Sequence, residues 1–446
     1  MTFCTSERVA AALGLPVPGV GSYTKISTDT RTIGPGDLFV ALQGPRFDAH
    51  EFLGAAQSKG ARAAVVRRGT APVPGLILYP VDDTLVALGS LARARRRFLP
   101  AGSPVVAITG SSGKTSTKEL IRVALWPRYR VHATAANLNN EIGVPLTILG
   151  APDDTQALVV EAGASVPGEI ARLRAVIERT IAVITNVGYA HVEGFGSFEG
   201  VLREKLSLLD GVPLAVVGLD PRELGEQARR RARTIVAGTQ PPADLQAEAV
   251  GLDEEGRCRV RFLGREVVLP LFGLHQAENA MIAIAVAREL GVDPLAALET
   301  LPNVTVPGGR GRVLHVGDLT IIDDTYNANP GSLQRAVESA AWLARERGRP
   351  LAVVVGSMLE LGPESAKLHA AAAADIVRRE PVLVGAVGEF AASFAPYRAR
   401  LGERLLVAAD AAELGPRLKS ALAGNEILLL KASRGVALEQ LLPHLS

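Results

Sequence analysis

Short apolar runs alternate with amphipathic segments along most of the chain, and this alternation predicts strands and helices in turn. In the first hundred residues we expect strands at 38–42 and 63–66 and helices at 52–59 and 82–98. The segment Leu99-Pro100-Ala101-Gly102-Ser103-Pro104 follows. Because clustered Gly and Pro interrupt regular structure, a domain boundary is expected there. Residues 1–100 are therefore predicted to form a small α/β domain.

The second stretch predicts a doubly wound parallel sheet, because its apolar runs are continuous and are separated by helical or loop segments. The expected strands are 105–109, 157–160, 181–185 and 214–217, with helices at 116–125 and 276–290 and β structure around 258–271. A second cluster of breakers covers 302–311. The predicted central domain is therefore 101–305.

The third stretch repeats the alternation and predicts a smaller Rossmann-like domain at 306–446. Its expected strands are 319–322, 351–355, 381–387 and 427–430, and its expected helices are 331–347, 365–379, 411–423 and 437–442. The fold class predicted for the whole chain is α/β, with three domains.

Composition supports a packed enzyme, since 48% of residues are hydrophobic and 21% are charged. Lys plus Arg (48) nearly balance Asp plus Glu (46), which argues against a nucleic-acid or membrane partner. Two arginine runs are interpreted as solvent-facing helix surfaces: Arg93, Arg95, Arg96 and Arg97, and Arg229, Arg230, Arg231 and Arg233. Cys4 and Cys258 are interpreted as packing residues. Without a signal segment or membrane-length apolar run, we expect a cytoplasmic protein. We also expect a monomer.

The segment Gly110-Ser111-Ser112-Gly113-Lys114-Thr115 follows a predicted strand and precedes a predicted helix. Two glycines permit tight turning, and the helix N-terminus offers N–H groups to a phosphate. Lys114 would reach the terminal phosphates of ATP, and the Thr115 hydroxyl would bind magnesium. Ile108 stands where the usual phosphate-loop pattern has its first glycine. A purely structural turn is the alternative.

Three further polar residues are candidates for a metal site. Glu161 ends a predicted strand, His191 lies shortly after another, and Lys205 lies in a helical segment. Parallel sheets place ligands at the carboxyl ends of strands. Taken singly, they are better interpreted as a loop glutamate, a structural or exposed histidine, and a solvated helix lysine.

Together, several motifs resemble the Mur ligase superfamily over nearly the whole chain. They are Thr109-Gly110-Ser111-Ser112-Gly113-Lys114-Thr115, residues 137–145, Glu161-Ala162-Gly163, residues 186–195 and residues 323–330. The segments 28–31, 35–44 and 47–50 are similar to that family's uridine-nucleotide-binding domain.

The resemblance implies an ATP-dependent amide ligase that joins D-alanyl-D-alanine to UDP-N-acetylmuramoyl-tripeptide through an acyl phosphate. It implies two Mg²⁺ sites: Thr115 and Glu161 share one magnesium, and His191 helps to hold the second. Lys114 contacts the β- and γ-phosphates. Lys205 matches the lysine that the family carbamylates with CO2, which turns a cation into an anion that orients metal.

The remaining site residues are also implied by the resemblance. The nucleotide set adds Gly110, Ser111, Ser112, Gly113, Ser116, His275, Asn279, Arg310 and Asp324. Arg312 competes with Arg310, and polar helix capping is the alternative for His275 and Asn279. The substrate set is Ser27, Asp29, Arg31, Gly44, Phe47, Asp48, His50, Asn137, Asn139, Asn140, Asn327, Asn329, Lys431, Ser433 and Arg434.

The sequence differs from the family pattern at one place, and two alternative functions remain to be considered. Ser165-Val166 occupies the place where some relatives have Asn-His, which puts substrate contacts of that pair in doubt. A rival ligase would add diaminopimelate or lysine, but residues 323–329 differ from the Asp-Asn-Pro-Arg segment of the diaminopimelate-adding relative. The second rival is a nucleotide-gated binding module, which would have no need of Glu161, His191 and Lys205 together.

Overall fold

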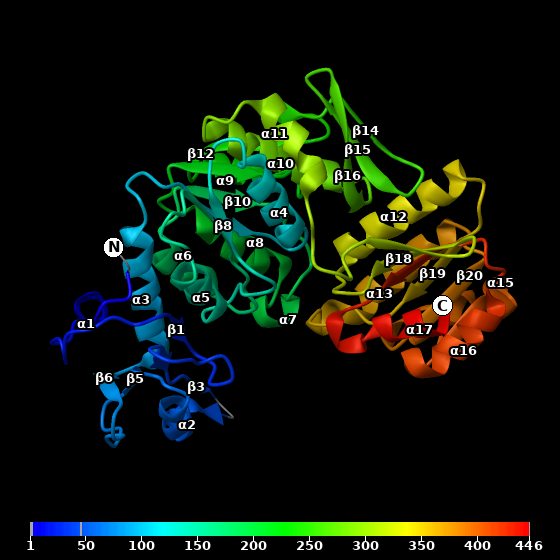
Figure 1. Cartoon of the computed structure of the whole chain (residues 1–446). Helices are drawn as coiled ribbons and strands as arrows, with labels where there is room; N and C mark the ends of the chain where they lie inside the picture. The colour runs from blue at the N-terminus through cyan, green and yellow to red at the C-terminus, as the bar shows by residue number, and fades with distance from the viewer. Residues whose placement is uncertain (1–2, 45–46, 446) are drawn as a thin grey trace. The chain divides into compact units, whose positions relative to one another are not determined.

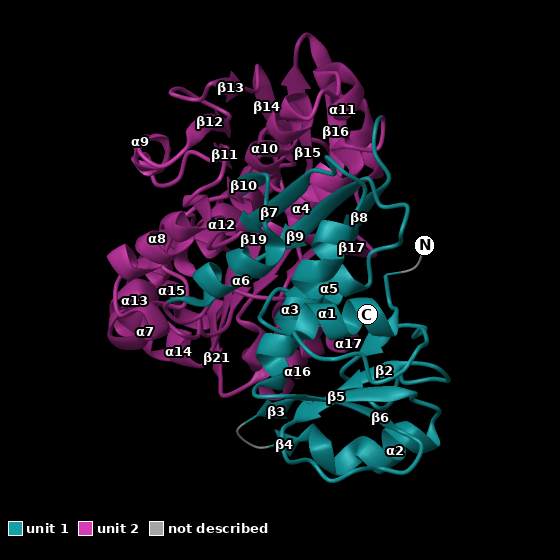
Figure 2. Cartoon of the chain, turned by 90° about the vertical axis from the view of Figure 1, so that its left-hand side faces the viewer, with its two compact units in different colours: residues 1–108, 128–164, 168–182 teal, residues 109–127, 165–167, 183–446 magenta. Residues whose placement is uncertain are grey.

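The structure is a computed structural model that describes residues 3–44 and 47–445. Residues 1–2 and 45–46 of the predicted first domain and residue 446 of the third lie outside the described part. The chain packs as two compact units, residues 1–108, 128–164 and 168–182, and residues 109–127, 165–167 and 183–446 (Figure 2). The predicted domain boundaries near residues 100 and 305 stay a prediction.

The N-terminal part is built on a four-stranded parallel sheet (Figure 1). Its order is β1 (Ile26–Ser27), β2 (Leu38–Val40), β5 (Ala63–Arg67) and β6 (Ile77–Val81), with helices α1 (Ser6–Leu13), α2 (Leu53–Ser58) and α3 (Thr84–Phe98). Alternate residues of β2 point to opposite faces, so Leu38 and Val40 enter one core while Phe39 enters another. The expected helices at 52–59 and 82–98 are confirmed within two residues.

A seven-stranded sheet forms the centre, in the order β13-β12-β11-β10-β7-β9-β8. Its strands are β7 (Val105–Thr109), β8 (Val131–Ala133), β9 (Ala157–Glu161), β10 (Ile181–Ile184), β11 (Leu214–Val217), β12 (Arg233–Gly238) and β13 (Leu245–Gln246). Every residue of β7, β9, β10 and β11 is buried, which is why their runs are continuously apolar. The pairs β7–β9, β8–β9, β11–β12 and β12–β13 are parallel, as expected.

The helices of this region are α4 (Lys114–Ala124), α5 (Gly143–Leu149), α6 (Glu169–Ile177), α7 (Val192–Phe195), α8 (Phe198–Leu206), α9 (Leu224–Arg229), α10 (Gln276–Glu289) and α11 (Pro294–Thr300). The β structure expected around 258–271 is an antiparallel sheet of β14 (Ala249–Leu252), β15 (Arg257–Phe262) and β16 (Arg265–Phe272). Leu263 and Gly264 join β15 to β16 with positive φ angles of 50° and 72°, as a two-residue hairpin turn requires.

The C-terminal sheet has the order β17-β18-β22-β19-β20-β21. Its strands are β17 (Arg312–Val316), β18 (Leu319–Asp324), β19 (Leu351–Val355), β20 (Leu383–Val387), β21 (Leu405–Ala408) and β22 (Ile427–Lys431), and β17 is an antiparallel edge on an otherwise parallel sheet. The helices are α12 (Pro330–Glu346), α13 (Ser365–Arg378), α14 (Glu389–Ser393), α15 (Arg398–Leu401), α16 (Ala411–Ala421) and α17 (Leu442–Leu445).

Two sequence expectations are wrong in this description. The helix predicted at 437–442 is instead a 3₁₀ turn at Leu438–Leu441 followed by α17, because Ala437 has a left-handed φ of 53°. Arg95 does not face solvent: its side chain is 2% exposed and pairs with Asp153 Oδ1 at 2.9 Å. Burial also lowers the pKa of this guanidinium. The arginine run in α3 therefore includes both exposed and buried positions.

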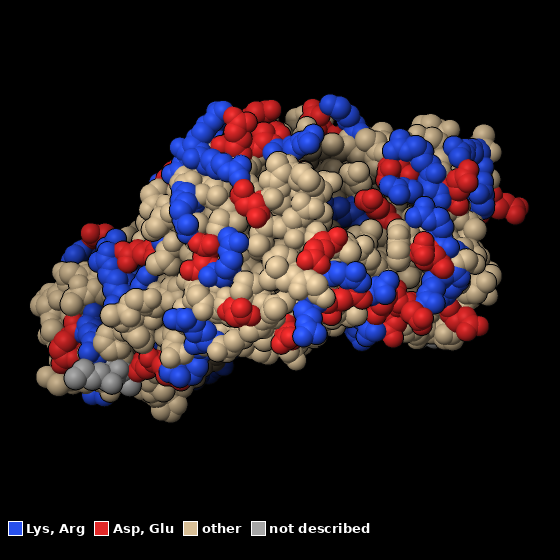
Figure 3. Space-filling model, turned by 90° about the horizontal axis from the view of Figure 1, so that it is seen from above, with Lys and Arg blue, Asp and Glu red and all other residues tan. Residues whose placement is uncertain are grey.

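Charge on the surface is mixed, as the composition suggested. On the face drawn in Figure 3, Lys and Arg side chains are interspersed with Asp and Glu. Both cysteines are free, and Cys258 is buried. Within residues 3–44 and 47–445, no helix has the length and apolarity needed to cross a membrane.

Candidate functional site

The loop between β7 and α4 has a backbone that only glycine permits at two positions. Gly110 has a φ of 149°, and a Cβ there would lie 2.0 Å from Thr185 Oγ1. Gly113 has a φ of 76°, and its Cβ would lie 2.9 Å from Asn279 Oδ1. These two glycines let the loop lie directly against neighbouring side chains, which fits a phosphate-binding loop better than an ordinary surface turn.

Residues just after β10 hold this loop in place. Asn186 Oδ1 accepts hydrogen bonds from Ser112 N (3.0 Å) and Ser112 Oγ (3.1 Å), while Thr185 Oγ1 donates to Ser112 O (2.6 Å). Ser111 N donates to Asn186 O at 3.0 Å, and Ser111 Oγ donates to Gly188 O at 3.0 Å. Asn186 and Thr185 therefore fix the loop before any ligand binds.

The helix that follows begins at Lys114 and has no side-chain cap. Its first-turn N–H groups and positive dipole end therefore suit an anion. Lys114 Nζ donates to Gly110 O at 2.8 Å, so the ammonium lies back over the loop. Thr115 and Ser116 are buried, with 2% and 8% of their surfaces exposed. The structure thus places the predicted residues 110–116 in one continuous loop and helix start.

Glu161 is the last residue of β9 and is 2% exposed, so its interpretation as an ordinary loop glutamate is wrong. It pairs in register with Ile108, two positions before Gly110 in the chain. Asn139 Nδ2 donates to Glu161 Oε1 at 2.9 Å, and Glu161 N donates to Thr134 Oγ1 at 2.9 Å. The predicted Asn139 therefore orients the predicted Glu161.

His191 precedes α7 in a left-handed conformation, with a φ of 57°. Its Nδ1 forms an ion pair with Glu360 Oε2, a contact between the segment after β10 and the loop after β19. Burial lowers the pKa of His191, Glu360 opposes that shift, and the charges of Lys114 and Lys205 add to it. His191 thus lies among two predicted lysines and one glutamate that the sequence did not single out.

Lys205 lies in α8 and is 1% exposed, so its interpretation as a solvated helix lysine is wrong. Its Nζ lies 5.6 Å from the centroid of the Phe195 ring. An ionisable group at such a position needs partners, because burial penalises charge. The burial favours a specific role for Lys205.

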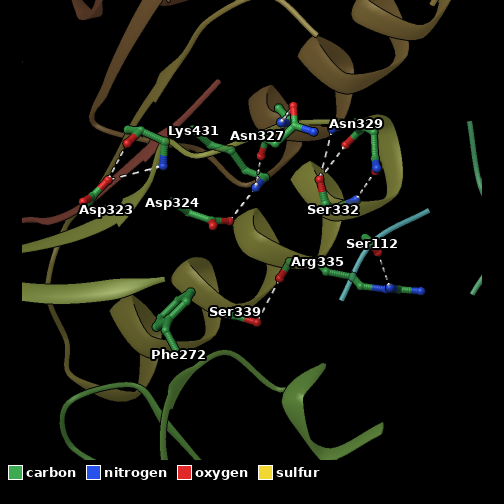
Figure 4. A network of polar contacts seen from close by, with 12 residues as sticks. Ser112, Phe272, Asp323, Asp324, Asn327, Asn329, Ser332, Arg335, Ser339 and Lys431 are labelled. Carbon is green, nitrogen blue, oxygen red and sulfur yellow. Dashed lines mark hydrogen bonds and ion pairs between the residues drawn. The ribbon is translucent and has the colours of Figure 1, made fainter. Parts of the chain in front are cut away.

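The turn-rich segment after β18 packs against the end of β22 (Figure 4). Lys431 Nζ donates to Asp324 Oδ2 at 2.5 Å and to Asn327 O at 3.0 Å. Ser433 Oγ donates to Ala328 O at 3.2 Å. Burial raises the pKa of Asp324, and Lys431 opposes that shift. The predicted Asp324, Asn327, Lys431 and Ser433 thus form one cluster.

Helix α12 begins beside the phosphate loop (Figure 4). Asn329 caps the helix through its Oδ1, which accepts from Ser332 N at 2.9 Å, and its Nδ2 donates to Ser111 O at 3.0 Å. Two turns on, Arg335 Nη1 donates to Ser112 Oγ at 3.4 Å, and Arg335 forms an ion pair with Asp220. Arg335 was missed in the sequence because it resembles any helix-surface arginine.

Of the two competing arginines, Arg310 is the one held near this cluster. Its guanidinium lies 3.6 Å from the centroid of the Tyr326 ring, and its Nε is buried without a hydrogen-bond partner. Arg312 is exposed on β17. Arg434 lies 5.8 Å from the same Tyr326 ring and pairs with Glu439 at 3.4 Å.

His275 and Asn279 lie at the start of α10, with His275 at the N-cap position rather than within the helix. Asn279 Oδ1 accepts from Thr117 Oγ1 at 3.0 Å, and Asn279 Nδ2 donates to Gln276 Oε1 at 2.9 Å. His275 Nδ1 is buried without a hydrogen-bond partner. Burial, with the charges of Arg335 and Lys431, lowers the pKa of His275 to about 3. The imidazole is therefore neutral at physiological pH.

A cavity of about 480 Å³ opens beside this region. Its lining includes Asp220, Arg222, Gln240, Pro241, Glu278 and Arg335. Because Arg335 also touches Ser112, the cavity and the phosphate loop share a wall. Burial raises the pKa of Glu278. None of the six was predicted from the sequence, since each is an ordinary surface residue type.

The predicted substrate residues near the N-terminus form two local groups. Ser27, the last residue of β1, lies close to Asp29 and Arg31. Asp29 N donates to Ser27 Oγ at 3.2 Å, and Arg31 Nη2 donates to Asp29 Oδ2 at 2.7 Å. The Arg31 hydrogen bonds lower the pKa of Asp29 to about 2. These contacts leave Arg31 88% exposed.

The second group surrounds a small hairpin of β3 (Gln43–Gly44) and β4 (Phe47–Asp48). Phe47 is 56% exposed and stacks on Phe52, with ring centroids 5.5 Å apart. His50 Nδ1 contacts Asp48 Oδ1 at 2.5 Å, and His50 Nε2 accepts from Arg67 N at 2.9 Å. Both ring nitrogens of His50 therefore serve the local fold.

Asn137 and Asn140 lie in the loop before α5. Asn140 Oδ1 accepts a hydrogen bond at 2.8 Å from the N–H of Gly143, the first residue of that helix. Asn137 is exposed. Asn139, between them, is the residue that contacts Glu161.

The oxygen atoms that the predicted metal ligands Thr115 and Glu161 offer suit magnesium better than a transition metal. In the part of the chain that the structure describes, no three His, Cys, Asp or Glu side chains gather as a metal site. Mg²⁺ is commonly bound through one or two carboxylates together with substrate phosphates and water. The Thr115 hydroxyl and the Glu161 carboxylate, both buried, are oxygen donors of the kind that Mg²⁺ prefers.

Comparison with known proteins agrees with this chemistry. The Mur ligase middle domain matches residues 108–287, and the Mur ligase glutamate ligase domain matches residues 309–434. The UDP-N-acetylmuramoyl-tripeptide--D-alanyl-D-alanine ligase of Bacillus subtilis is 35% identical over 99% of this chain and 97% of its own length.

Two crystal structures are similar as well. MurF from Acinetobacter baumannii has a TM-score of 0.88 at 30% identity, covering 99% of this chain and 98% of its own. MurF ligase from Thermotoga maritima, in complex with ADP, has a TM-score of 0.80 at 28% identity, covering 94% and 96%.

Proposed function

The chain belongs to the Mur ligase family, and on that basis we propose that it joins D-alanyl-D-alanine to UDP-N-acetylmuramoyl-tripeptide at the expense of ATP. The match to the Bacillus subtilis ligase over nearly the full length of both chains carries the choice of substrates. The loop at residues 110–115, with its two required glycines, supports the use of ATP.

The proposed reaction has two steps. A carboxylate oxygen of the tripeptide attacks the γ-phosphorus of ATP, the bond to the β-γ bridging oxygen breaks, and ADP leaves. The amine of the dipeptide then attacks the acyl carbon, loses a proton, and displaces phosphate, which carries away one former carboxylate oxygen. Catalysis of this kind depends on positioning and on neutralising phosphate charge.

We propose that the N–H groups of the first turn of α4 and the Lys114 ammonium bind the phosphates of the nucleotide. Two predicted side chains support the nucleotide assignment, since Arg310 Nε and His275 Nδ1 are buried nitrogens without hydrogen-bond partners. The cavity beside Arg335 has room for an adenosine, and Asp220 and Glu278 offer acceptors there. Asn279 would contribute through its packing against Gly113.

For the metals, we propose Thr115 and Glu161 as ligands of one Mg²⁺ and His191 as a ligand of a second. Bound magnesium would neutralise phosphate charge. Lys205, carbamylated by CO2, would orient metal as an anion, and its burial supports a specific role of this kind.

For the substrates, we assign the N-terminal groups around Asp29 and Phe47 to the UDP end of the peptide, with the exposed Phe47 and Phe52 rings offering a stacking surface. The cluster of Asn327, Asn329, Lys431, Ser433 and Arg434 is assigned to the acceptor side. We further propose a cytoplasmic monomer.

The experiment that tests this function measures phosphate release from ATP with UDP-muramoyl-tripeptide and three acceptors. Release that requires D-alanyl-D-alanine supports the proposal. Release driven by diaminopimelate or lysine alone would replace it with the rival single-residue ligase. ATP binding with no release under any acceptor would favour a nucleotide-gated binding protein.

A further inference from the structure

The contact between His191 and Glu360 joins two segments that lie far apart in the chain. Glu360 Oε2 pairs with His191 Nδ1, and Glu360 O accepts from Glu193 N at 3.1 Å. Gly362 lies against the same segment, since a Cβ there would be 3.2 Å from Glu193 Cα. Loop 356–362, which follows β19, therefore touches residues 191–193 at three points.

Loop 356–362 is itself held firmly. Met358 N donates to His369 Nε2 at 2.9 Å, while His369 Nδ1 donates to Ser365 O at 2.8 Å, so both nitrogens of this fully buried ring are used. Leu359 N donates to Ser433 Oγ at 2.9 Å. Glu360 is held at a left-handed φ of 64°, a conformation that costs energy for a residue with a Cβ.

The charged groups around His191 indicate what its contact with Glu360 can do. Lys114 and Lys205 are the cationic groups that act on this imidazole, and Glu360 supplies an opposing carboxylate. A histidine that binds metal through one ring nitrogen commonly donates its other N–H to a carboxylate, which fixes the ring and strengthens the ligand. Because Nδ1 faces Glu360 Oε2, His191 keeps Nε2 for a cation.

We propose that Glu360 is a positioning residue for His191, and that loop 356–362 thereby links the C-terminal sheet to the binding of the second cation. The proposal rests on the ligase function and on His191 as a metal ligand. It adds Glu360, a residue from the loop after β19 whose side chain is 55% exposed.

The test uses the full-length protein with ADP and Mn²⁺, whose binding is followed by electron paramagnetic resonance. Glu360→Ala should weaken one class of Mn²⁺ site by about 10- to 100-fold, the usual effect of removing such an outer partner. Glu360→Gln keeps an acceptor oxygen without the charge and should lose less. Glu364→Ala, which removes an exposed carboxylate paired with Lys367, is the matched control and should bind Mn²⁺ like the wild type.

The outcomes separate the two proposals. A moderate loss of Mn²⁺ affinity in Glu360→Gln and a larger loss in Glu360→Ala, with thermal midpoints near that of the wild type, support the positioning role. Wild-type Mn²⁺ binding by Glu360→Ala, or equal losses in the Glu364→Ala control, overturns it even where the wild-type enzyme shows dipeptide-dependent phosphate release. Absence of that release from the wild-type enzyme overturns the ligase function instead.

Discussion

Asn329 connects helix α12 to the phosphate loop with the two ends of a single amide. Its Oδ1 caps the helix by accepting from Ser332 N at 2.9 Å, and its Nδ2 donates to Ser111 O at 3.0 Å. The two interactions use different atoms. A substitution can therefore remove the loop contact and keep the cap.

Asn329→Asp is predicted to separate these roles. Aspartate caps a helix as well as asparagine does, so the thermal midpoint should stay near that of the wild type. The second carboxylate oxygen would face Ser111 O, and ADP binding should weaken by about 3-fold or more, as expected for losing a hydrogen bond. Calorimetric titration with ADP checks this, and Ser332→Ala, which alters the capping box alone, is the control. Unchanged ADP affinity in Asn329→Asp would show that the hydrogen bond from Asn329 to Ser111 O does not support the phosphate loop.

Arg335 is predicted to contribute to nucleotide binding, although no sequence motif marks it. Arg335→Gln removes the ion pair with Asp220 and the contact with Ser112 Oγ at the wall of the cavity. ATP binding should weaken by about 10-fold, because a hydrogen bond to a charged group contributes about 1.5–3 kcal/mol. Arg345→Gln, on the exposed end of the same helix, should bind ATP normally. Equal affinities for the two variants would remove Arg335 from the site.

Lys205→Ala is predicted to lose turnover by about 100-fold while keeping ADP affinity, since the side chain is assigned to metal rather than to nucleotide. Short carboxylates such as formate should restore part of the activity, because they replace the missing anion. Lys367→Ala, at an exposed lysine, serves as the control. Full activity of Lys205→Ala without added carboxylate would show that this buried lysine has only a packing role.

His275 is predicted to make the protein less stable as the medium becomes acidic. Burial lowers its pKa in the folded state from 6.5 to about 3, so the unfolded chain takes up the proton more readily. Its contribution to stability is fully present above pH 6.5 and is lost as the pH falls toward 3. His275→Gln should flatten the fall in urea midpoint over that range, whereas His315→Gln, at an exposed position, should not. Parallel curves for wild type and His275→Gln would refute the prediction.

Most of the fold was predictable because buried parallel strands are continuous apolar runs. Strands β7, β11 and β19 match their predicted bounds to the residue. Strand β8 escaped prediction because its three residues are only partly buried, and edge strand β17 carries Arg312 and His315. Sequence periodicity detects burial, so elements at the margins of sheets are the ones that it misses.

The parts of the candidate site that are continuous in the sequence were predictable. The parts formed by residues from distant segments were not. Residues 110–116 form one loop and the start of the helix after it, and Glu161 ends a strand as expected. The partners Glu360, Asp220 and Arg335 come from distant segments, and their residue types are common on any surface. Arg95 was wrongly expected to face solvent, because a charged side chain suggests exposure until its buried partners are known.

The central claim is that ATP activates a peptide carboxylate, and isotope transfer tests it most directly. UDP-muramoyl-tripeptide carrying ¹⁸O in its terminal carboxylate would be incubated with ATP, Mg²⁺ and D-alanyl-D-alanine, and the released phosphate analysed by mass spectrometry. We predict one ¹⁸O atom in each phosphate released, because the acyl phosphate breaks at the carbon–oxygen bond. Unlabelled phosphate, formed at the same rate with or without the dipeptide, would contradict the account.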